Sequence, residues 1–153
     1  MIPATTARVP AHTSAEYNQR IHRATQANVA RYAAQGPEAI DRRLAELDYE
    51  WDIERVLEAN ASSLVVLGCA LGTFISRKFF VLPAVVGGFL LQHAIQGWCP
   101  PVPFFRRRGV RTQREIDEER FALKALRGDF EQIRDEAMTA RSDAQQAIAA
   151  ARR

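Results

Sequence analysis

The chain has few of the residues that build metal centres, disulfide frameworks or nucleophilic active sites. Its 153 residues include two cysteines, Cys69 and Cys99, and three histidines. Two widely spaced cysteines are too few for the disulfide framework of a small secreted protein, and none has the Cys/His spacing of a metal site. The signatures of serine hydrolases, phosphate-binding loops, dinucleotide sites and zinc proteases are also missing. We therefore expect no enzyme, no bound metal and no cofactor.

Charge is nearly absent from the middle third of the chain, although the flanking sequence is rich in Ala, Arg, Glu and Gln. Between Ser62 and Ile95 the only cationic or acidic side chains are Arg77, Lys78 and His93. The segment 61–75 would be about 22 Å long as a helix, and the segment 79–98 about 30 Å, which matches the hydrocarbon core of a bilayer. The intervening Ser76-Arg77-Lys78 is expected to form a turn.

Both segments are apolar on all faces, whereas a helix on the surface of a soluble protein carries one apolar stripe. The sequence therefore predicts an all-α protein with a two-span transmembrane helical hairpin over residues 56–98, in preference to a hairpin buried in a soluble bundle. The first span is short for a bilayer, so Val56–Asn60 would have to reach into the headgroup region or the membrane would have to thin. No cleaved signal peptide is expected from the first residues.

Two helical arms are expected to flank the hairpin in the cytosol. Residues 1–12 are typical of a flexible tail, and Thr13 with Glu16 predicts a capping box for a helix that ends near Ala34. Gly36-Pro37 predicts a break and a second helix, which we expect to continue into the first span. An apolar seam is expected along that helix: Ile40, Leu44, Leu47 and Trp51. Together these elements make an N-terminal cytosolic region over residues 13–55.

The C-terminal arm follows a Pro- and Arg-rich linker at residues 99–111 and occupies residues 112–153. Thr112 and Glu115 predict a capping box for a helix that reaches Arg127, before a break at Gly128-Asp129. A heptad seam typical of a coiled coil continues across this break: Leu123, Leu126, Phe130, Ile133, Ala137, Ala140, Ala144, Ala147 and Ala151. Because its alanines bury little area, we expect a partner helix to pack against it.

Flanking cations predict the orientation of the hairpin. They lie before it at Arg42, Arg43 and Arg55, and after it at Arg106, Arg107, Arg108, Arg111 and Arg114. Only Arg77 and Lys78 lie in the turn, so the positive-inside rule places both termini in the cytoplasm. We expect Arg106, Arg107 and Arg108 to bind lipid headgroups, not nucleic acid, beside the interfacial aromatics Trp98, Phe104 and Phe105.

Each span carries a pair of small residues four positions apart, Gly68 with Gly72 and Ala84 with Gly88. Such pairs let helix backbones approach closely in lipid. They predict either a dimerisation face or packing within the hairpin, and the sequence favours neither.

A polar cluster is expected at the cytoplasmic end of the spans, and its members are Asn60, Gln92, His93, Gln96 and Cys99. The favoured interpretation is hydrogen bonding between the helices, with Asn60 and Glu58 as partners on the first span. The alternative is a small pocket that binds a solute or positions the Cys99 thiol, whose pKa nearby arginines would lower. For Cys99 itself a structural or interfacial role is favoured, because no second cysteine lies near it. We also considered ion pairs from Glu54 and Glu58 to residues 106–108.

Two motifs resemble the YgaP-like bacterial inner-membrane domain family: Asp52-Ile53-Glu54-Arg55-Val56-Leu57 before the first span and Gln96-Gly97-Trp98-Cys99-Pro100 after the second. That family combines an Ile-Glu-Arg entry, a helical hairpin and a Gly-x-Cys-Pro exit. The resemblance covers about residues 46–108, and in a subgroup it reaches Phe130. It implies a bacterial inner-membrane location and a tendency to dimerise. The rhodanese domain of the namesake is not expected, because Phe74 and Phe104 stand where its CxxxxR loop needs arginine.

These features favour a non-enzymatic inner-membrane protein that forms a homodimer through its spans and presents cytosolic helices to a protein partner. The alternative hypothesis is a small conduit, or a thiol-dependent handler of a sulfur-containing solute, that uses Cys99 and the polar cluster.

Overall fold

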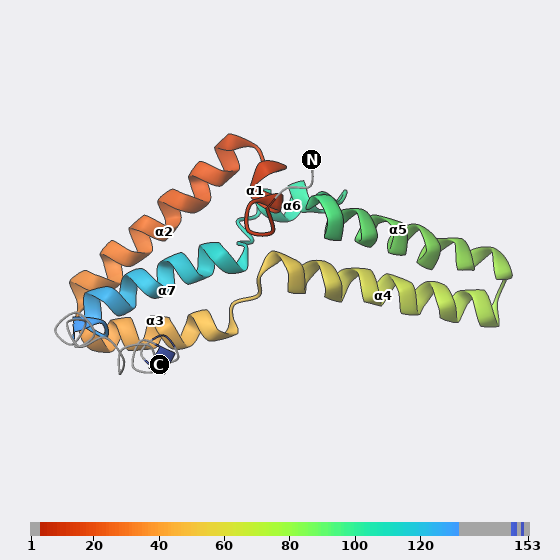
Figure 1. Ribbon diagram of the computed structural model, residues 1–153. Coiled ribbons are helices and arrows are strands. Elements are labelled where there is room, and N and C mark those ends of the chain that lie inside the picture. Colours follow the sequence, from red (N-terminus) through yellow and green to blue (C-terminus); the bar gives the residue numbers. More distant parts are fainter. Residues whose placement is uncertain (1–3, 132–147, 150, 152–153) are drawn as a thin grey trace. The chain divides into compact units, whose positions relative to one another are not determined.

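The computed structural model describes residues 4–131, 148, 149 and 151 (Figure 1). Along the chain the elements are α1 (Arg8–Ala11), α2 (Ala15–Gln35), α3 (Pro37–Tyr49), α4 (Ile53–Phe74), the 3-10 helix η1 (Arg77–Phe80), α5 (Val81–Gln96), α6 (Val102–Arg107) and α7 (Gln113–Arg127). The described residues contain no strand, which confirms the all-α prediction. The chain forms two compact units, one of residues 1–24 and 51–116, the other of residues 25–50 and 117–153.

In the first unit, α4 begins at its own capping residue. The side chain of Asp52 accepts a hydrogen bond from the Arg55 backbone N–H at 2.9 Å, which satisfies one of the unpaired donors of the first turn. The preceding helix, α3, ends at Tyr49, and Glu50 adopts an extended backbone. The expectation of one continuous helix from α3 into the apolar segment was therefore wrong, because Glu50 leaves the helical conformation and Asp52 caps the start of a new helix.

The apolar helices α4 and α5 lie side by side and are joined by η1 (Figure 1); we call them the α4–α5 pair. With 22 residues α4 is about 33 Å long, whereas α5 has 16 residues and is about 24 Å long. The bounds of the helices differ from those of the apolar segments because α4 extends back through residues 53–60 and η1 takes up the first residues of the second segment.

Close packing within the α4–α5 pair depends on glycine in α4. A Cβ added at Gly68 would lie 2.5 Å from Cδ of Pro83, and one at Gly72 would lie 2.9 Å from the Phe80 ring. In contrast, a Cβ at Gly88 in α5 would meet nothing within 4 Å. The glycines of α4 therefore pack against α5 and η1 of the same chain, while Gly88 of α5 lies on an uncovered surface.

Most of the apolar surface of the pair is exposed. Two stretches of the chain are long and apolar enough to cross a membrane: Pro37–Phe74, which contains α4, and Arg77–Gln96, which contains η1 and α5. Only 22% of the most apolar part of the first stretch and 6% of that of the second are buried. Large side chains such as Val66 and Leu91 are 68% and 64% exposed. A core helix of a soluble protein has the opposite pattern, because its apolar side chains are covered.

The core of the first unit lies at the polar end of the pair, where α1, α4 and α6 meet. Its buried members are Val9, Ile53, Leu57, Cys99 and Val102, with Phe105 and Val110 packed against them. The backbone N–H of Ile53 also donates to the Arg111 carbonyl at 2.8 Å, which ties the start of α4 to the segment before α7.

The second unit contains the later part of α2, all of α3 and most of α7. Three residues of the expected α3 seam, Ile40, Leu44 and Leu47, are buried, whereas Trp51 lies beyond the helix and is half exposed. Pro37 opens α3 after Gly36, as predicted. Ion pairs join α7 to α3, from Arg120 to Asp48 and from Arg43 to the buried Glu119.

α7 runs from Gln113 to Arg127, and the predicted Thr112–Glu115 capping box is formed in both directions. The Thr112 N–H donates to the Glu115 carboxylate at 2.8 Å, and the Glu115 N–H donates to the Thr112 hydroxyl at 3.3 Å. At α2 the cap differs from the prediction, since Ser14 accepts from the Tyr17 N–H. Of the expected heptad seam, Leu123 is buried and Leu126 exposed; Ile133 to Ala147 lie outside the described residues.

Candidate functional site at the polar end of the α4–α5 pair

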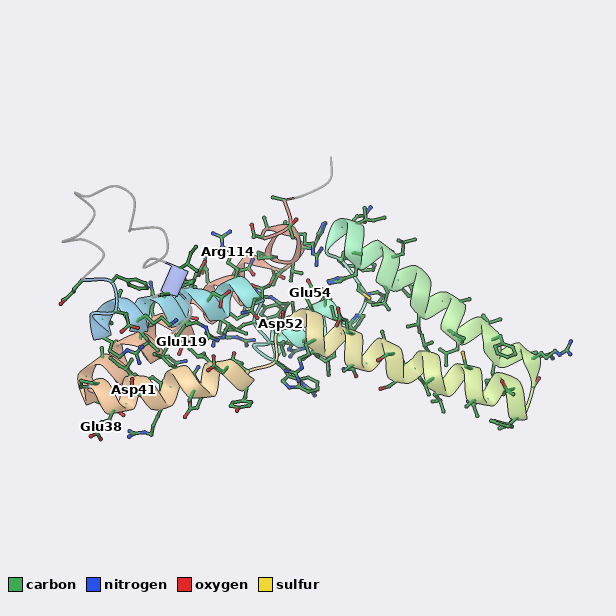
Figure 2. The ribbon with its side chains drawn as sticks, turned by 60° about the horizontal axis from the view of Figure 1, so that its bottom comes forward. Glu38, Asp41, Asp52, Glu54, Arg114 and Glu119 are labelled. Carbon is green, nitrogen blue, oxygen red and sulfur yellow. The ribbon has the colours of Figure 1, made fainter. Side chains whose placement is uncertain are left out.

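Glu54 lies in the first turn of α4 (Figure 2). Its carboxylate is shared by two basic side chains. Its Oε1 accepts a hydrogen bond from Arg8 Nη2 at 2.8 Å, and its Oε2 lies 2.8 Å from His93 Nε2. An ionised carboxylate only accepts hydrogen bonds, so Nε2 of His93 carries a hydrogen and donates a hydrogen bond to Glu54. The three residues come from α1, α4 and α5, and they join the ends of these helices.

Glu54 is held in its charged form. The hydrogen bond from His93 lowers its pKa, burial raises it, and the hydrogen bond from Arg8 lowers it further, with a net result of about 2. Favourable hydrogen bonding to the ionised carboxylate therefore outweighs the cost of taking it partly out of water.

Arg8 also reaches the last turn of α5. Its Nη1 donates to the Ala94 carbonyl at 3.3 Å, one of the carbonyls that a helix end leaves without an intrahelical partner. The Arg8 backbone fits against Gly97, the left-handed residue that ends α5 with φ 78°. A Cβ at Gly97 would lie 2.5 Å from the Arg8 carbonyl carbon, so both the backbone conformation and the contact require glycine.

Two polar atoms of this cluster are buried without a hydrogen-bond partner among the described residues. They are Nδ1 of His93, a side chain only about 5% exposed, and Nε of Arg8. Each lost its hydrogen bonds to water when it was buried, and this opposes the contacts that Glu54 makes.

Cys99 lies in the apolar core beside this cluster and is 5% exposed. Burial raises the pKa of its thiol. A pKa lowered by nearby arginines belonged to the interpretation of Cys99 as a reactive thiol. The raised pKa and the position among Val9, Ile53 and their neighbours fit the favoured interpretation, a structural cysteine. A buried, protonated thiol is a weak nucleophile. Cys69 is exposed on α4.

Arg106 is fully buried and does not face the surface where we expected it to meet lipid headgroups. It donates to both carboxylate oxygens of Glu115, at 2.6 and 2.7 Å, to the Val110 carbonyl at 3.0 Å and to Oδ1 of Asn18 at 2.9 Å. Burial of Glu115 tends to raise its pKa, but the hydrogen bonds from Arg106 and Thr112 outweigh it and the pKa is lowered. Arg107 and Arg108 are exposed.

The remaining residues of the expected polar cluster on α4 and α5 are Asn60, Gln92 and Gln96. Asn60 donates to the Val56 carbonyl of its own helix at 2.7 Å, Gln92 is half buried and Gln96 is exposed. The hydrogen-bonded partner of His93 is Glu54 rather than Asn60 or Glu58. Sequence reasoning missed Arg8 and Gly97 as parts of this site. An available signal was the antiparallel arrangement of a hairpin, which places the first turn of one helix beside the last turn of the other.

Near the polar end, two exposed aromatic rings are each in contact with an arginine guanidinium. The Arg55 guanidinium lies 4.4 Å from the centre of the Trp51 ring, and that of Arg108 lies 4.1 Å from the Phe104 ring. Such cation–π pairs combine an apolar face with a charge, the combination that suits a membrane–water interface.

Among the described residues, no group of three or more His, Cys, Asp or Glu side chains is placed to hold a metal ion. The site can bind a guanidinium group and hold helix ends together; it presents no accessible nucleophile with an adjacent base. Comparison of the chain with protein-family models, with curated proteins and with solved structures gives no match.

Proposed function

We propose that the protein is a non-enzymatic, membrane-spanning protein of the bacterial inner membrane, and that it presents helical cytosolic arms to a protein partner. The segments 61–75 and 79–98, which overlap α4, η1 and α5, cross the bilayer as a hairpin. The observation that carries this proposal is the exposed apolar surface of these helices. Contiguous apolar surface of this extent is unfavourable in water and marks contact with a membrane or a partner.

The two ends of the α4–α5 pair suit opposite faces of a bilayer. Arg77 and Lys78 lie at the η1 end, and the exposed Arg55, Arg107 and Arg108 lie at the polar end. Because the larger number of arginines flanks the polar end, the positive-inside rule places that end and both termini in the cytoplasm. The turns of α4 formed by residues 53–60 lengthen a span that would otherwise be short, and carry the helix through the headgroup region.

Self-association of this protein is proposed to use α5. Gly68 and Gly72 of α4 are occupied by Pro83 and Phe80 of the same chain. Ala84 and Gly88 are exposed, and the space above Gly88 is open, so a second copy can approach the α5 backbone closely. The partner-binding part of the proposal rests on the arm of residues 112–153, where Phe121 and Leu126 of α7 are exposed.

The resemblance to YgaP-like domains supports the inner-membrane location. A thiol-dependent solute handler would need an accessible thiolate, whereas Cys99 is buried and burial raises the pKa of its thiol.

Cys69 provides a direct test of membrane insertion. Its side chain is exposed on the protein surface, so in a soluble protein it would react readily with a water-soluble maleimide. In a Cys99→Ala variant in native membranes, we expect Cys69 to be protected until the membranes are dissolved in SDS. The protein should also resist carbonate extraction, and protease should reach the N-terminal arm only from the cytoplasmic side. Labelling of Cys69 in intact membranes, or release by carbonate, would contradict the proposal.

A further inference from the structure

The N-terminal residues 8–13, which we call the strap, lie across the polar end of the α4–α5 pair. Arg8 contacts Glu54 and the Ala94 carbonyl, and Val9 enters the apolar core that contains Cys99. The strap is tied to the start of α2, since the Thr13 hydroxyl donates to the Val9 carbonyl at 2.8 Å and Asn18 Nδ2 donates to the Pro10 carbonyl at 2.9 Å.

Three features at the polar end of the pair match the side chains and backbone of the strap. The Glu54 carboxylate and the Ala94 carbonyl bind a guanidinium group, and Ile53, Leu57 and Val102 surround an aliphatic side chain. Gly97 allows the backbone between these two side chains to approach closely. The surface therefore fits an arginine followed by an aliphatic residue, as a docking site fits a short peptide motif.

The strap is held by few contacts. α1 has four residues and no side-chain cap, and Val9 is its only buried residue. Docking also leaves Nε of Arg8 and Nδ1 of His93 buried without hydrogen-bond partners among the described residues, which opposes it. Segments with little buried apolar area open more readily than the core of a protein.

We propose that the polar end of the α4–α5 pair is a docking site for an arginine–aliphatic segment, and that residues 8–13 are its releasable occupant in the same chain. Release of the strap uncovers His93 and Cys99 and makes the site available to a competing segment of the same chemistry. This inference goes beyond the proposed membrane function and does not depend on it.

The first test uses the Cys99 thiol as a reporter in the full chain in detergent, with Cys69 replaced by alanine. Gly97→Val should displace the strap, because its Cβ would overlap the Arg8 backbone, and should raise the rate of maleimide labelling of Cys99 by about tenfold or more. Gly109→Val is the matched control. Gly109 has a similar φ of 86°, but a Cβ there meets nothing within 4 Å, so its labelling rate should stay close to that of the parent.

The second test asks whether the site accepts the segment from outside. Arg8→Glu, which places two carboxylates together, should also raise Cys99 labelling, and a synthetic peptide of residues 4–13 should restore protection. The same peptide with alanine in place of Arg8 should not. If Arg8→Glu does not fold, Arg8→Gln replaces it and is assessed in the same way. Equal labelling of the Gly97→Val and Gly109→Val proteins, or no protection by the arginine peptide, would overturn the proposal.

Discussion

The buried ion pair of Arg106 and Glu115 gives the sharpest prediction about stability. The Arg106 side chain is 0% exposed, and both its terminal nitrogens donate to Glu115. Glu115→Gln keeps the size of the side chain and an oxygen that can accept from the Thr112 N–H and from Arg106 Nη1. It removes the carboxylate charge that compensates the buried guanidinium, and it turns an amide NH2 donor towards Arg106 Nη2, which is itself a donor.

We expect Glu115→Gln to lower the free energy of unfolding by about 3–5 kcal/mol, the usual cost when one partner of a buried pair is removed. Arg106→Met in the Glu115→Gln background should recover part of this loss, because the uncompensated charge is then gone. The double-mutant cycle should give a coupling energy of about 2 kcal/mol. Glu118→Gln is the control: this residue is exposed on the same helix, and its replacement should cost less than about 1 kcal/mol.

The measurement is guanidinium unfolding in a mild detergent, followed by far-UV circular dichroism. Two-state behaviour should be checked with a second probe, because the chain has two compact units. A loss for Glu115→Gln no larger than for Glu118→Gln, or a coupling energy near zero, would show that the buried pair does not hold α6 to the start of α7.

Two further predictions follow from the pair and its polar end. The pKa of Glu54 is lowered from 4.5 to about 2, so the stability that its charge contributes is present above about pH 4.5 and is lost as the pH falls towards 2. Glu54→Gln should abolish that part of the acid unfolding transition followed by circular dichroism. An acid unfolding profile that is unchanged in this variant would contradict the role of Glu54. Gly72→Leu should destabilise the fold, because the new side chain would overlap the Phe80 ring. Gly88→Leu should leave folding intact and reduce the fraction of dimer measured by analytical ultracentrifugation. A dimer fraction unaffected by Gly88→Leu would exclude this face of α5 as the dimer interface.

Local features of this chain were predictable from the sequence because they depend on residues close to one another. The apolar segments around residues 61–75 and 79–98 are visible as runs without charge, and both fall in exposed, helical parts of the structure. The Thr112–Glu115 capping box formed as predicted, since its two hydrogen bonds join residues three positions apart. The start of α4 at Asp52 is equally local, because its capping hydrogen bond joins residues 52 and 55, but it was not predicted.

The pairing of charges was decided only by the tertiary structure. The sequence offers many arginines and acids with similar local context, and Arg106 is adjacent in sequence to the exposed Arg107 and Arg108. What distinguishes it is that the fold brings Glu115 and Asn18 to it and removes water. Likewise, Glu54 binds Arg8 and His93 because the ends of α1, α4 and α5 meet. Composition and spacing determined which segments are apolar and helical, while long-range contacts, on which burial and ion pairing depend, determined where the site lies and made Cys99 inaccessible.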